Sequence, residues 1–346
     1  MERFREGAVS FLAENKQTRG SEAFFNPDRE FDRNLNVLLI KAIGRSGLDG
    51  LDLMSASGVR GLRLAVETEG FKTMALNDLN TYSVLKKNVE SNSDLIKSEV
   101  SVSSFNAAET YKFGKVFDYI DIDPFGSPVT YALYAMNSIK LGGILALTAT
   151  DTAALYGRAA KACALKYRSV SCKTSYYNEL GLRILLKRID EIAGIYKKSI
   201  EPMIFDVRRH YIRTYIKIGR IKSSTEIDTI YQCPECPNRS MQEEFMCSNC
   251  GAEMNRLGPL WTGRLFDRDL VLKMYELSSG LKEKEYLSAL KEEEDMISYY
   301  TTTEIAKYLK QPEKKNGLLG SKTVLNPKGF RTKMAFKELV GLYSKL

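Results

Sequence analysis

Short apolar runs alternate with amphipathic segments through the first two thirds of the chain. The runs have the length and the content of branched residues that suit strands buried on both faces. The segments between them place apolar residues three and four positions apart, which is typical of helices. Strands are expected at residues 48–54, 72–78, 99–105, 117–122 and 143–149. This alternation predicts an α/β fold built on a doubly wound sheet of parallel strands.

The pattern changes after the fifth expected strand. Helices are expected at residues 153–167 and 178–196, and two strands then follow each other directly at 203–207 and 211–218. Neighbouring strands that have no helix between them are typical of an antiparallel pair. We therefore expect the sheet to end in an antiparallel hairpin.

Polar residues stand where several expected strands end, at the edge where open α/β sheets bind ligands. The small-residue loop 55–61 follows the first strand and opens a helix, although it lacks the full glycine fingerprint of dinucleotide sites. Asp78 ends the second strand and could accept ribose hydroxyls, while Asn106 and the backbone N–H of Ala107 could hold an adenine edge. Asp78 and Asn106 could equally be turn or helix-cap residues.

The fourth expected strand ends in Asp123, Pro124, Phe125 and Gly126. The strand stops here because a proline cannot donate to the ladder. A carboxylate and a rigid carbonyl could both accept hydrogens from an aromatic amine, localising its lone pair, and Asp123 could take the leaving proton. Phe125 could stack on the base. The segment resembles the Asp/Asn-Pro-Pro-aromatic motif of methyltransferases that act on exocyclic amino groups, and the alternative is an ordinary turn after an acidic strand end.

The N-terminal segment places an aromatic pair, Phe24 and Phe25, before an Asn-Pro turn that could form a lid. A helix is expected at residues 32–45. Arg33 stands in its first turn, where the helix dipole disfavours a cation. Arg33 therefore either serves an anion or is a solvated surface residue.

Four of the six cysteines form a Cys-x2-Cys-x10-Cys-x2-Cys pattern: Cys233, Cys236, Cys247 and Cys250. Two thiolate pairs in tight turns give a closed tetrahedral shell, which suits structural Zn²⁺ without a catalytic role. Redox-active cysteines are the alternative. The following stretch at 257–263 is expected to be a turn anchored by Trp261.

The last eighty residues are expected to form a small α+β domain, of winged-helix or mixed type. Helices are expected at residues 267–275 and 281–290, and a third helix begins near Thr302 with Thr303 as its N-cap. Nine lysines and arginines lie between residues 307 and 337, against Glu313 as the only acid. Such a surface suits a phosphate backbone, and the alternative is a solvated lysine face.

The formal net charge of +8 favours an acidic partner such as nucleic acid. No apolar run is long enough to span a membrane, and the charged start does not resemble a secretory signal. We therefore expect a cytoplasmic protein without a membrane partner. The change in composition after the hairpin divides the chain into expected domains 1–222 and 223–346.

Taken together, the aromatic Asn-Pro turn, the loop 55–61, the Asp-Pro-Phe-Gly-Ser-Pro run and the cysteine pairs resemble one family almost end to end. The sequence is similar to the tRNA (guanine-26-N2)-dimethyltransferases in their shorter archaeal form. The resemblance implies a Rossmann-like methyltransferase sheet with a zinc-containing C-terminal domain that binds tRNA. It implies transfer of one or two methyl groups from S-adenosyl-L-methionine to N2 of guanine 26.

The resemblance also implies roles for single residues. Asp123 would be the catalytic acid/base, and Phe24 and Phe125 would sandwich the flipped guanine. The implied cofactor contacts are Arg33, Arg60, Asp78, Asn106 and Ala107, with Arg63 as the alternative to Arg60. The chain departs from the family pattern at residues 32–34, which read Asp-Arg-Asn instead of Asn-Arg-Asp, and at Asn106, where an acid is usual.

Two other functions fit parts of the sequence. An amino-methyltransferase for adenine or cytosine in DNA would share the Asp-Pro-Phe motif. A non-catalytic zinc-ribbon RNA-binding protein would share the cysteines and the basic C-terminal region. A nicotinamide dehydrogenase is disfavoured, because the glycine fingerprint is incomplete.

Overall fold

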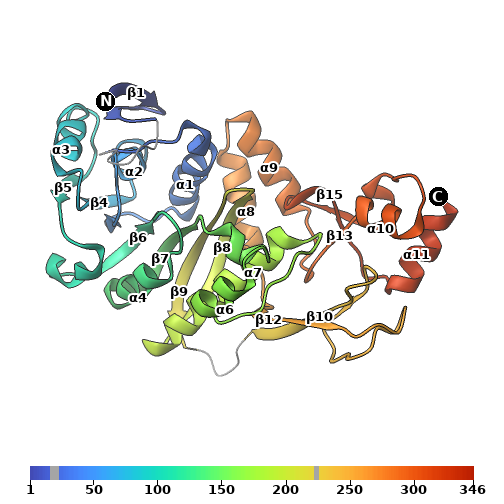
Figure 1. Cartoon of the computed structure of the whole chain (residues 1–346). Helices are drawn as coiled ribbons and strands as arrows, with labels where there is room; N and C mark the ends of the chain where they lie inside the picture. Colours follow the sequence, from blue (N-terminus) through green and yellow to red (C-terminus); the bar gives the residue numbers. More distant parts are fainter. Residues whose placement is uncertain (16–22, 222–225) are drawn as a thin grey trace.

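A computed structural model describes residues 1–15, 23–221 and 226–346 of the chain. Its centre is a seven-stranded sheet in the order β5-β4-β3-β6-β7-β9-β8 (Figure 1). The first five strands in this order are parallel, whereas β9 runs antiparallel to both of its neighbours. The strands are β3 (Leu48–Asp52), β4 (Phe71–Asn77), β5 (Glu99–Ser103), β6 (Phe117–Ile122), β7 (Ile139–Ala149), β8 (Lys198–Arg208) and β9 (Tyr211–Arg220). The doubly wound sheet and its terminal hairpin are confirmed.

Strand order reverses between β3 and β6, so the loops that follow these two strands leave the same edge in opposite directions. That position is the usual ligand crevice of an open α/β sheet. Every residue of β6 is buried, as the sequence pattern indicates. The loop 55–61 and Asp123 therefore meet at the centre of the molecule.

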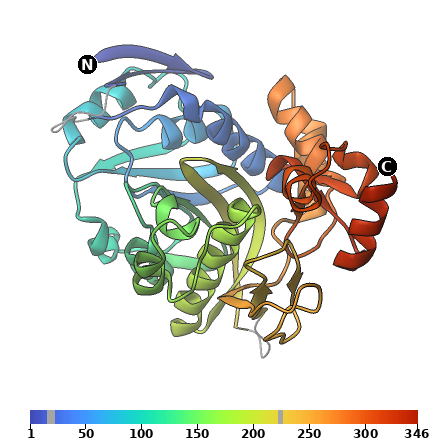
Figure 2. The same ribbon diagram turned by 45° about the vertical axis from the view of Figure 1, so that its right-hand side comes forward.

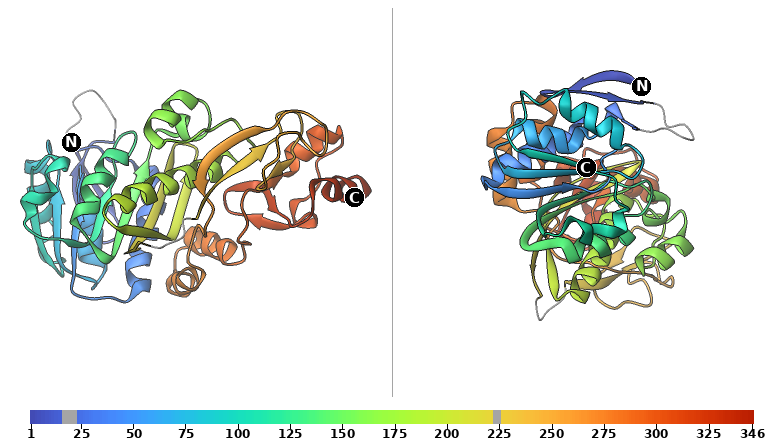
Figure 3. Two further views of the ribbon diagram at one scale, coloured as in Figure 1. Left: turned by 90° about the horizontal axis from the view of Figure 1, so that it is seen from below. Right: turned by 90° about the vertical axis from the view of Figure 1, so that its left-hand side faces the viewer.

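The helices form two outer layers, one on each side of the sheet (Figures 1 and 3). One layer contains α1 (Glu30–Ile43), α2 (Val59–Glu67) and α3 (Tyr82–Glu90), and the other contains η2 (Ala107–Phe113), α4 (Val129–Ser138) and α7 (Tyr177–Ile195). The helix expected at 153–167 is divided into α5 (Thr152–Leu155) and α6 (Ala160–Tyr167). The break falls at Gly157, where a Cβ would lie 2.0 Å from the Cys172 backbone.

An N-terminal hairpin, β1 (Glu2–Glu6) and β2 (Val9–Ala13), lies over α2 and α3 and was not expected from the sequence. Within the described residues, the outer edge of β2 pairs with no further strand, and its backbone groups form hydrogen bonds with side chains instead. Asn88 Oδ1 accepts from Leu12 N–H at 2.7 Å, and Asn92 makes the same kind of pair with Ser10. The two asparagines stand one helical turn apart on α3 and its end, so they match the spacing of alternate strand residues.

The C-terminal region lies beyond β8 and β9, at the opposite end of the molecule from β5 (Figures 1 and 2). It contains two small sheets: β11-β10-β12 and β13-β15-β14. The expected division after residue 222 falls outside the described residues. The strands are β10 (Ile227–Gln232), β11 (Arg239–Ser240), β12 (Asn255–Trp261), β13 (Tyr300–Thr301), β14 (Ser321–Thr323) and β15 (Asn326–Arg331).

Helices α8 (Arg268–Leu277), α9 (Leu281–Lys291), α10 (Thr302–Leu309) and α11 (Phe336–Lys345) complete this region, with the short turn η3 (Asn316–Leu318). Two expectations about it were wrong. The stretch expected as a turn at 257–263 is largely strand β12, although Trp261 is buried as expected. The N-cap of α10 is Thr301 instead of Thr303, because Thr301 forms a reciprocal capping box with Glu304.

A buried ion cluster joins this region to the sheet domain. Arg331 on β15 contacts Glu179 on α7 at 2.9 Å and Glu293 at 2.7 Å, and all three side chains are at most 2% exposed. Arg331 also donates to the carbonyls of Met296 and Ser298. Arg183 on α7 donates to backbone carbonyls after β12. The charges are therefore paired and hydrogen-bonded, and the two parts of the chain are held in one arrangement.

We predict that Arg331→Met lowers the free energy of unfolding by about 3–5 kcal/mol, because it leaves two carboxylates buried without their shared partner. Chemical denaturation followed by fluorescence would measure this. The matched control is Arg264→Met, since Arg264 is 82% exposed and pairs with Asp295 at the surface. Such exposed pairs contribute about 0–1 kcal/mol. Equal effects of the two substitutions would contradict the proposed role of the cluster.

Candidate active site and metal centre

Asp123 follows β6 at the central crevice and is held by two arginines from opposite sides. Arg29 Nη1 lies 2.9 Å from Asp123 Oδ1, and Arg60 Nη2 lies 2.9 Å from Asp123 Oδ2. The Asp123 side chain keeps 23% of its surface exposed, whereas the two arginine side chains are 11% and 7% exposed. The carboxylate therefore faces the solvent from within a largely buried cluster.

A second row of charges supports the first. Asp32 on α1 accepts from Arg60 Nη1 at 2.7 Å and also pairs with Arg29. Asp121 on β6 accepts from Arg213 Nη1 at 2.8 Å, and Arg213 is completely buried. Carboxylates and guanidiniums thus alternate beneath the crevice, so each buried charge has partners of opposite sign.

This network fixes the charge of the carboxylates. Burial alone would raise the pKa of Asp123, but Arg29 and Arg60 hold it well below its usual range. The same two arginines outweigh burial at Asp32 and lower its pKa to about 2. Asp123 is consequently an ionised acceptor of hydrogen bonds at any physiological pH.

The turn after Asp123 is held rigidly against the end of β7. Gly126 N–H donates to Thr150 Oγ1 at 2.6 Å, and Thr150 N–H donates to the Gly126 carbonyl at 2.9 Å. Gly126 has a φ of +93°, a conformation that favours glycine. These hydrogen bonds fix the turn that follows Asp123 and Pro124.

Two aromatic rings lie together just after Asp123. Phe125 is 68% exposed, although it is a large apolar side chain. Its ring centroid lies 5.7 Å from that of Phe24, with the planes inclined by 50°. The structure thus brings Phe24 to Phe125, which stands about a hundred residues later in the sequence and two residues after Asp123.

Asp52, the last residue of β3 before the loop 55–61, adds a fourth carboxylate. Asp52 Oδ2 accepts from Gly61 N–H at 3.1 Å, and the loop turns through Gly58 with a φ of +80°. Burial, with Asp121 nearby, raises the pKa of Asp52 to about 7. A cation at this edge would therefore be stabilised by ionisation of Asp52.

Asp78 and Asn106 lie at the ends of the next two strands. Asp78 Oδ2 accepts from Ala56 N–H in the loop at 3.0 Å, and Oδ1 accepts from Asn80 N–H at the same distance. Asn106 caps η2, because its Oδ1 accepts from Ala108 N–H at 2.9 Å. Asn106 is exposed and Ala107 is half-buried. The alternative that both residues serve as turn or cap residues thus holds, and their expected contact with a cofactor stays a prediction.

Arg33 and Arg63 point away from Asp123. Arg33 is 5% exposed and pairs with Glu6 of the N-terminal hairpin, with Nε–Oε1 at 2.6 Å. Arg63 contacts the same Glu6 at 2.9 Å and Glu67 at 2.7 Å. The solvated alternative for Arg33 is therefore wrong, and the anion that it contacts here is Glu6. Of the arginines on α2, Arg60 is the one that reaches Asp123.

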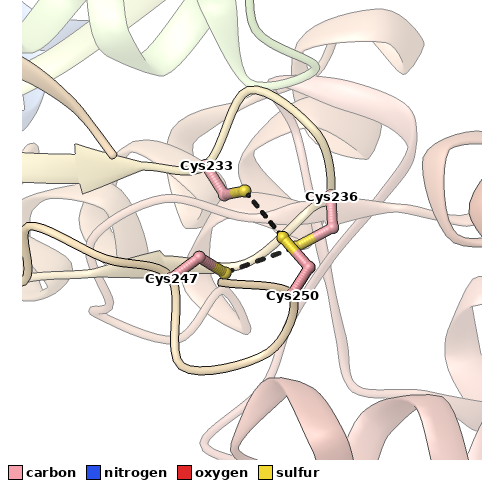
Figure 4. Close-up of side chains that lie close together, drawn as sticks. All are labelled: Cys233, Cys236, Cys247 and Cys250. Carbon is pink, nitrogen blue, oxygen red and sulfur yellow. Dashed lines mark hydrogen bonds between the residues drawn. The ribbon is translucent and has the colours of Figure 1, made fainter. Parts of the chain in front are cut away.

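The four cysteines converge as their spacing indicates. Their sulfur atoms all lie within 4.8 Å of one another, at the tips of two tight turns (Figure 4). Cys233 N–H donates to the Asn238 carbonyl, and Cys247 N–H donates to the Ala252 carbonyl. Asn238 Nδ2 donates to Cys247 Sγ at 3.4 Å. Four converging sulfurs without a further ligand position could hold a metal ion in a closed shell.

The sequence analysis missed Asp52 at the end of β3, and it missed the members of the charge network Arg29, Asp32, Asp121 and Arg213. Their partners lie 28 to 94 positions away along the chain, so no local pattern indicates them. The one local signal was the pairing of Arg29 with Asp32 three positions later in a helical turn.

Among the described helices, none has the length and apolarity to cross a membrane.

Comparison with known proteins agrees with this geometry. Residues 7–343 match the family model of N2,N2-dimethylguanosine tRNA methyltransferases. A tRNA (guanine(26)-N(2))-dimethyltransferase from Metallosphaera sedula is 33% identical, and the match covers 92% of this chain and 88% of that protein. A tRNA (guanine(26)-N(2)/guanine(27)-N(2))-dimethyltransferase from Aquifex aeolicus is 30% identical, over 98% of this chain and 95% of that protein.

A solved structure has the same fold throughout. Trm1 from Pyrococcus horikoshii in complex with S-adenosyl-L-methionine matches with a TM-score of 0.86 and 26% identity, over 99% of both chains. The sheet, the active-site crevice and the C-terminal region are thus parts of one shared architecture. This chain belongs to the N2,N2-dimethylguanosine tRNA methyltransferase family.

Proposed function

We propose that this protein transfers methyl groups, one or two per base, from S-adenosyl-L-methionine to N2 of guanine 26 in tRNA. The observation that carries this function is the Asp123 carboxylate, which Arg29 and Arg60 hold directly before Pro124 and Phe125, with the Phe125 ring in contact with that of Phe24. That arrangement offers two acceptors to an amino group and two ring faces to a base. A duplex-DNA methyltransferase would share the carboxylate, and the family assignment favours tRNA.

The ligand edge fits S-adenosyl-L-methionine in its chemistry. Asp78 at the end of β4 would accept the ribose hydroxyls, and Asn106 with Ala107 would border the adenine. Asp52 would ionise beside the ammonium group, since burial and Asp121 raise its pKa to about 7 although Arg60 opposes that rise, and a further cation would lower it. Arg60 lines the same edge, whereas Arg33 would reach the cofactor only by releasing Glu6. When bound, the cofactor supplies an electrophilic methyl group on a sulfonium.

The residues of the chain would then act on the amine. Asp123 and the Pro124 carbonyl accept the N2 hydrogens and keep the nitrogen lone pair directed at the methyl carbon. The new N–C bond forms as the S–C bond breaks, and one proton must leave the nitrogen. Asp123 is the nearest acceptor for that proton and passes it to solvent, because its low pKa disfavours the protonated form.

The base has to leave its stack in the tRNA to reach this carboxylate. Phe24 and Phe125 now contact each other, so the two rings must separate to admit a guanine between them. Phe125, being exposed, is free to move. Stacking on aromatic rings contributes roughly 1–3 kcal/mol per base and so offsets much of the cost of flipping.

The region from residue 223 to the C-terminus would hold the tRNA, with residues 1–222 as the methyltransferase domain. A hollow of about 370 Å³ opens between η3 and the β14–β15 hairpin, and its lining includes Lys314, Lys315, Lys322 and Lys328. Lysines at a concave surface suit phosphate groups. The four cysteines would bind structural Zn²⁺ and fix the turns on which this region is built.

We predict that Asp123→Asn lowers kcat at least a hundredfold, while the Kd for S-adenosyl-L-methionine changes less than threefold. The substitution keeps the shape of the side chain but removes the negative charge that accepts the amine hydrogens. Methyl incorporation into tRNA and calorimetry would measure the two effects. Asp78→Asn is the matched control, since it should weaken cofactor binding instead. Near-normal turnover of Asp123→Asn would refute its catalytic assignment.

We predict that Phe125→Ala raises KM for tRNA about tenfold, the effect of losing one stacking contact. Phe125→Tyr keeps a ring of the same size and should stay within about twofold of the original protein. Steady-state kinetics at saturating methyl donor would separate KM from kcat. Stacking is the wrong account of Phe125 if Phe125→Ala binds tRNA as tightly as the unchanged protein does.

We predict one equivalent of zinc per chain, lost in Cys247→Ser and kept in Cys172→Ser. Elemental analysis would measure it. Chelation should expose residues 231–252 to limited proteolysis, because the two turns lose the ion that joins them. Binding of S-adenosyl-L-methionine should persist, since the crevice lies in the other domain. Full zinc content in Cys247→Ser would contradict the assigned ligand set.

A further inference from the structure

Arg29 is held on several sides by elements that are distant in sequence. It ends the short 3-10 helix η1 (Pro27–Arg29). Besides Asp123, its guanidinium contacts Asp32 on α1 and donates from Nη2 to Thr148 Oγ1 on β7 at 3.3 Å. The guanidinium also lies over the ring of Tyr211 on β9, 4.4 Å from its centroid. These contacts fix the conformation of the Arg29 side chain before any ligand binds, at a cost in conformational entropy.

The contacts of Arg29 determine which part of Asp123 stays available. An ionised carboxylate has about four acceptor positions, two on each oxygen. Oδ2 is contacted by Arg60 Nη2 at 2.9 Å and by Arg29 Nη1 at 3.2 Å, whereas Oδ1 is contacted by Arg29 alone. One acceptor position on Oδ1 therefore remains, and the side chain is still 23% exposed.

We propose that Arg29 is a positioning residue for methyl transfer, which turns the Asp123 carboxylate so that the free acceptor position of Oδ1 meets the amino group of the substrate. This inference rests on the proposed function. Arg29 would not touch the reacting atoms itself. Arg60 contacts only Oδ2 of Asp123, so Arg60 alone would leave the carboxylate free to rotate. Arg29 contacts both oxygens and would fix that rotation.

The chain segment that carries Arg29 supports this assignment. Arg29 stands five residues after Phe24, and the intervening Asn26 caps η1 by accepting from Asp28 N–H at 2.9 Å. The neighbouring Phe25 is buried against Phe11 of the N-terminal hairpin, with ring centroids 4.9 Å apart. One short, anchored segment therefore carries both a ring for the base and the support for the carboxylate, so the two are set in place together.

The charges around Asp123 keep it ionised even without Arg29. Asp123 is faced by the cations Arg29, Arg60 and Arg213 and by the carboxylates Asp32, Asp121 and Asp52. Arg29 is the cation that lowers the pKa of Asp123 most, and removing it lets this pKa rise towards its usual acidic value, which lies far below neutral pH. At neutral pH a loss of activity in an Arg29 variant therefore reports the orientation of the carboxylate and not its protonation.

The test compares Arg29→Met, Arg29→Lys and Arg208→Met at pH 7.5, where Asp123 is ionised. In Arg29→Met we expect kcat to fall at least tenfold, while KM for tRNA changes less than threefold. In Arg29→Lys kcat should recover only part of that loss, because one ammonium cannot contact Asp32, Thr148 and Asp123 together and so fixes the carboxylate less firmly. Arg208 pairs with Asp206 and not with Asp123, so Arg208→Met should leave both quantities unchanged.

Two controls keep the outcomes distinct. The Kd for S-adenosyl-L-methionine should change less than threefold in all three variants, which shows that each one is folded. An unchanged kcat in Arg29→Met would overturn the positioning role, as would a rise in KM for tRNA without a fall in kcat. Failure of the unmodified protein to methylate guanine 26 would instead refute the proposed function, whatever Arg29 does.

Discussion

The alternation of carboxylates and guanidiniums beneath the central crevice is the interaction on which the site depends. Asp123, Asp32 and Asp121 are paired with Arg29, Arg60 and Arg213 in a cluster that is almost entirely buried. Separately, each of these charges would be too costly to bury. Together they fix one another, and they place a single ionised carboxylate at the surface of an otherwise rigid edge. The low pKa of Asp123 follows from this arrangement.

The network also explains why distant parts of the chain meet here. Its members come from η1, α1, α2, β6 and β9, so the cluster forms only when the sheet is complete and the N-terminal segment has closed over it. A second buried cluster around Arg331 fixes the C-terminal region to α7. The crevice and the lysine-lined hollow are thus held in one arrangement, which suits the proposed binding of tRNA at both.

Much of this could be predicted from the sequence, because some signals are local. Strand periodicity indicated the order of elements, Pro124 marked the end of β6, and cysteine spacing indicated the four-cysteine cluster that could hold a metal ion. The partners of Asp123 could not be predicted, since they depend on which strand ends become neighbours. The N-terminal hairpin was missed because its outer edge is completed by the side chains of Asn88 and Asn92, a pairing that no strand pattern reveals.

The central claim is that Asp123 accepts a hydrogen bond from the amino group that becomes methylated. A crystal structure with tRNA and S-adenosyl-L-homocysteine would test it most directly. We predict that N2 of guanine 26 lies within hydrogen-bond distance of Asp123 Oδ1, with the base between Phe24 and Phe125 and with Arg29 still bound to the carboxylate. A guanine seated elsewhere, with its amino group out of reach of Asp123, would contradict the account.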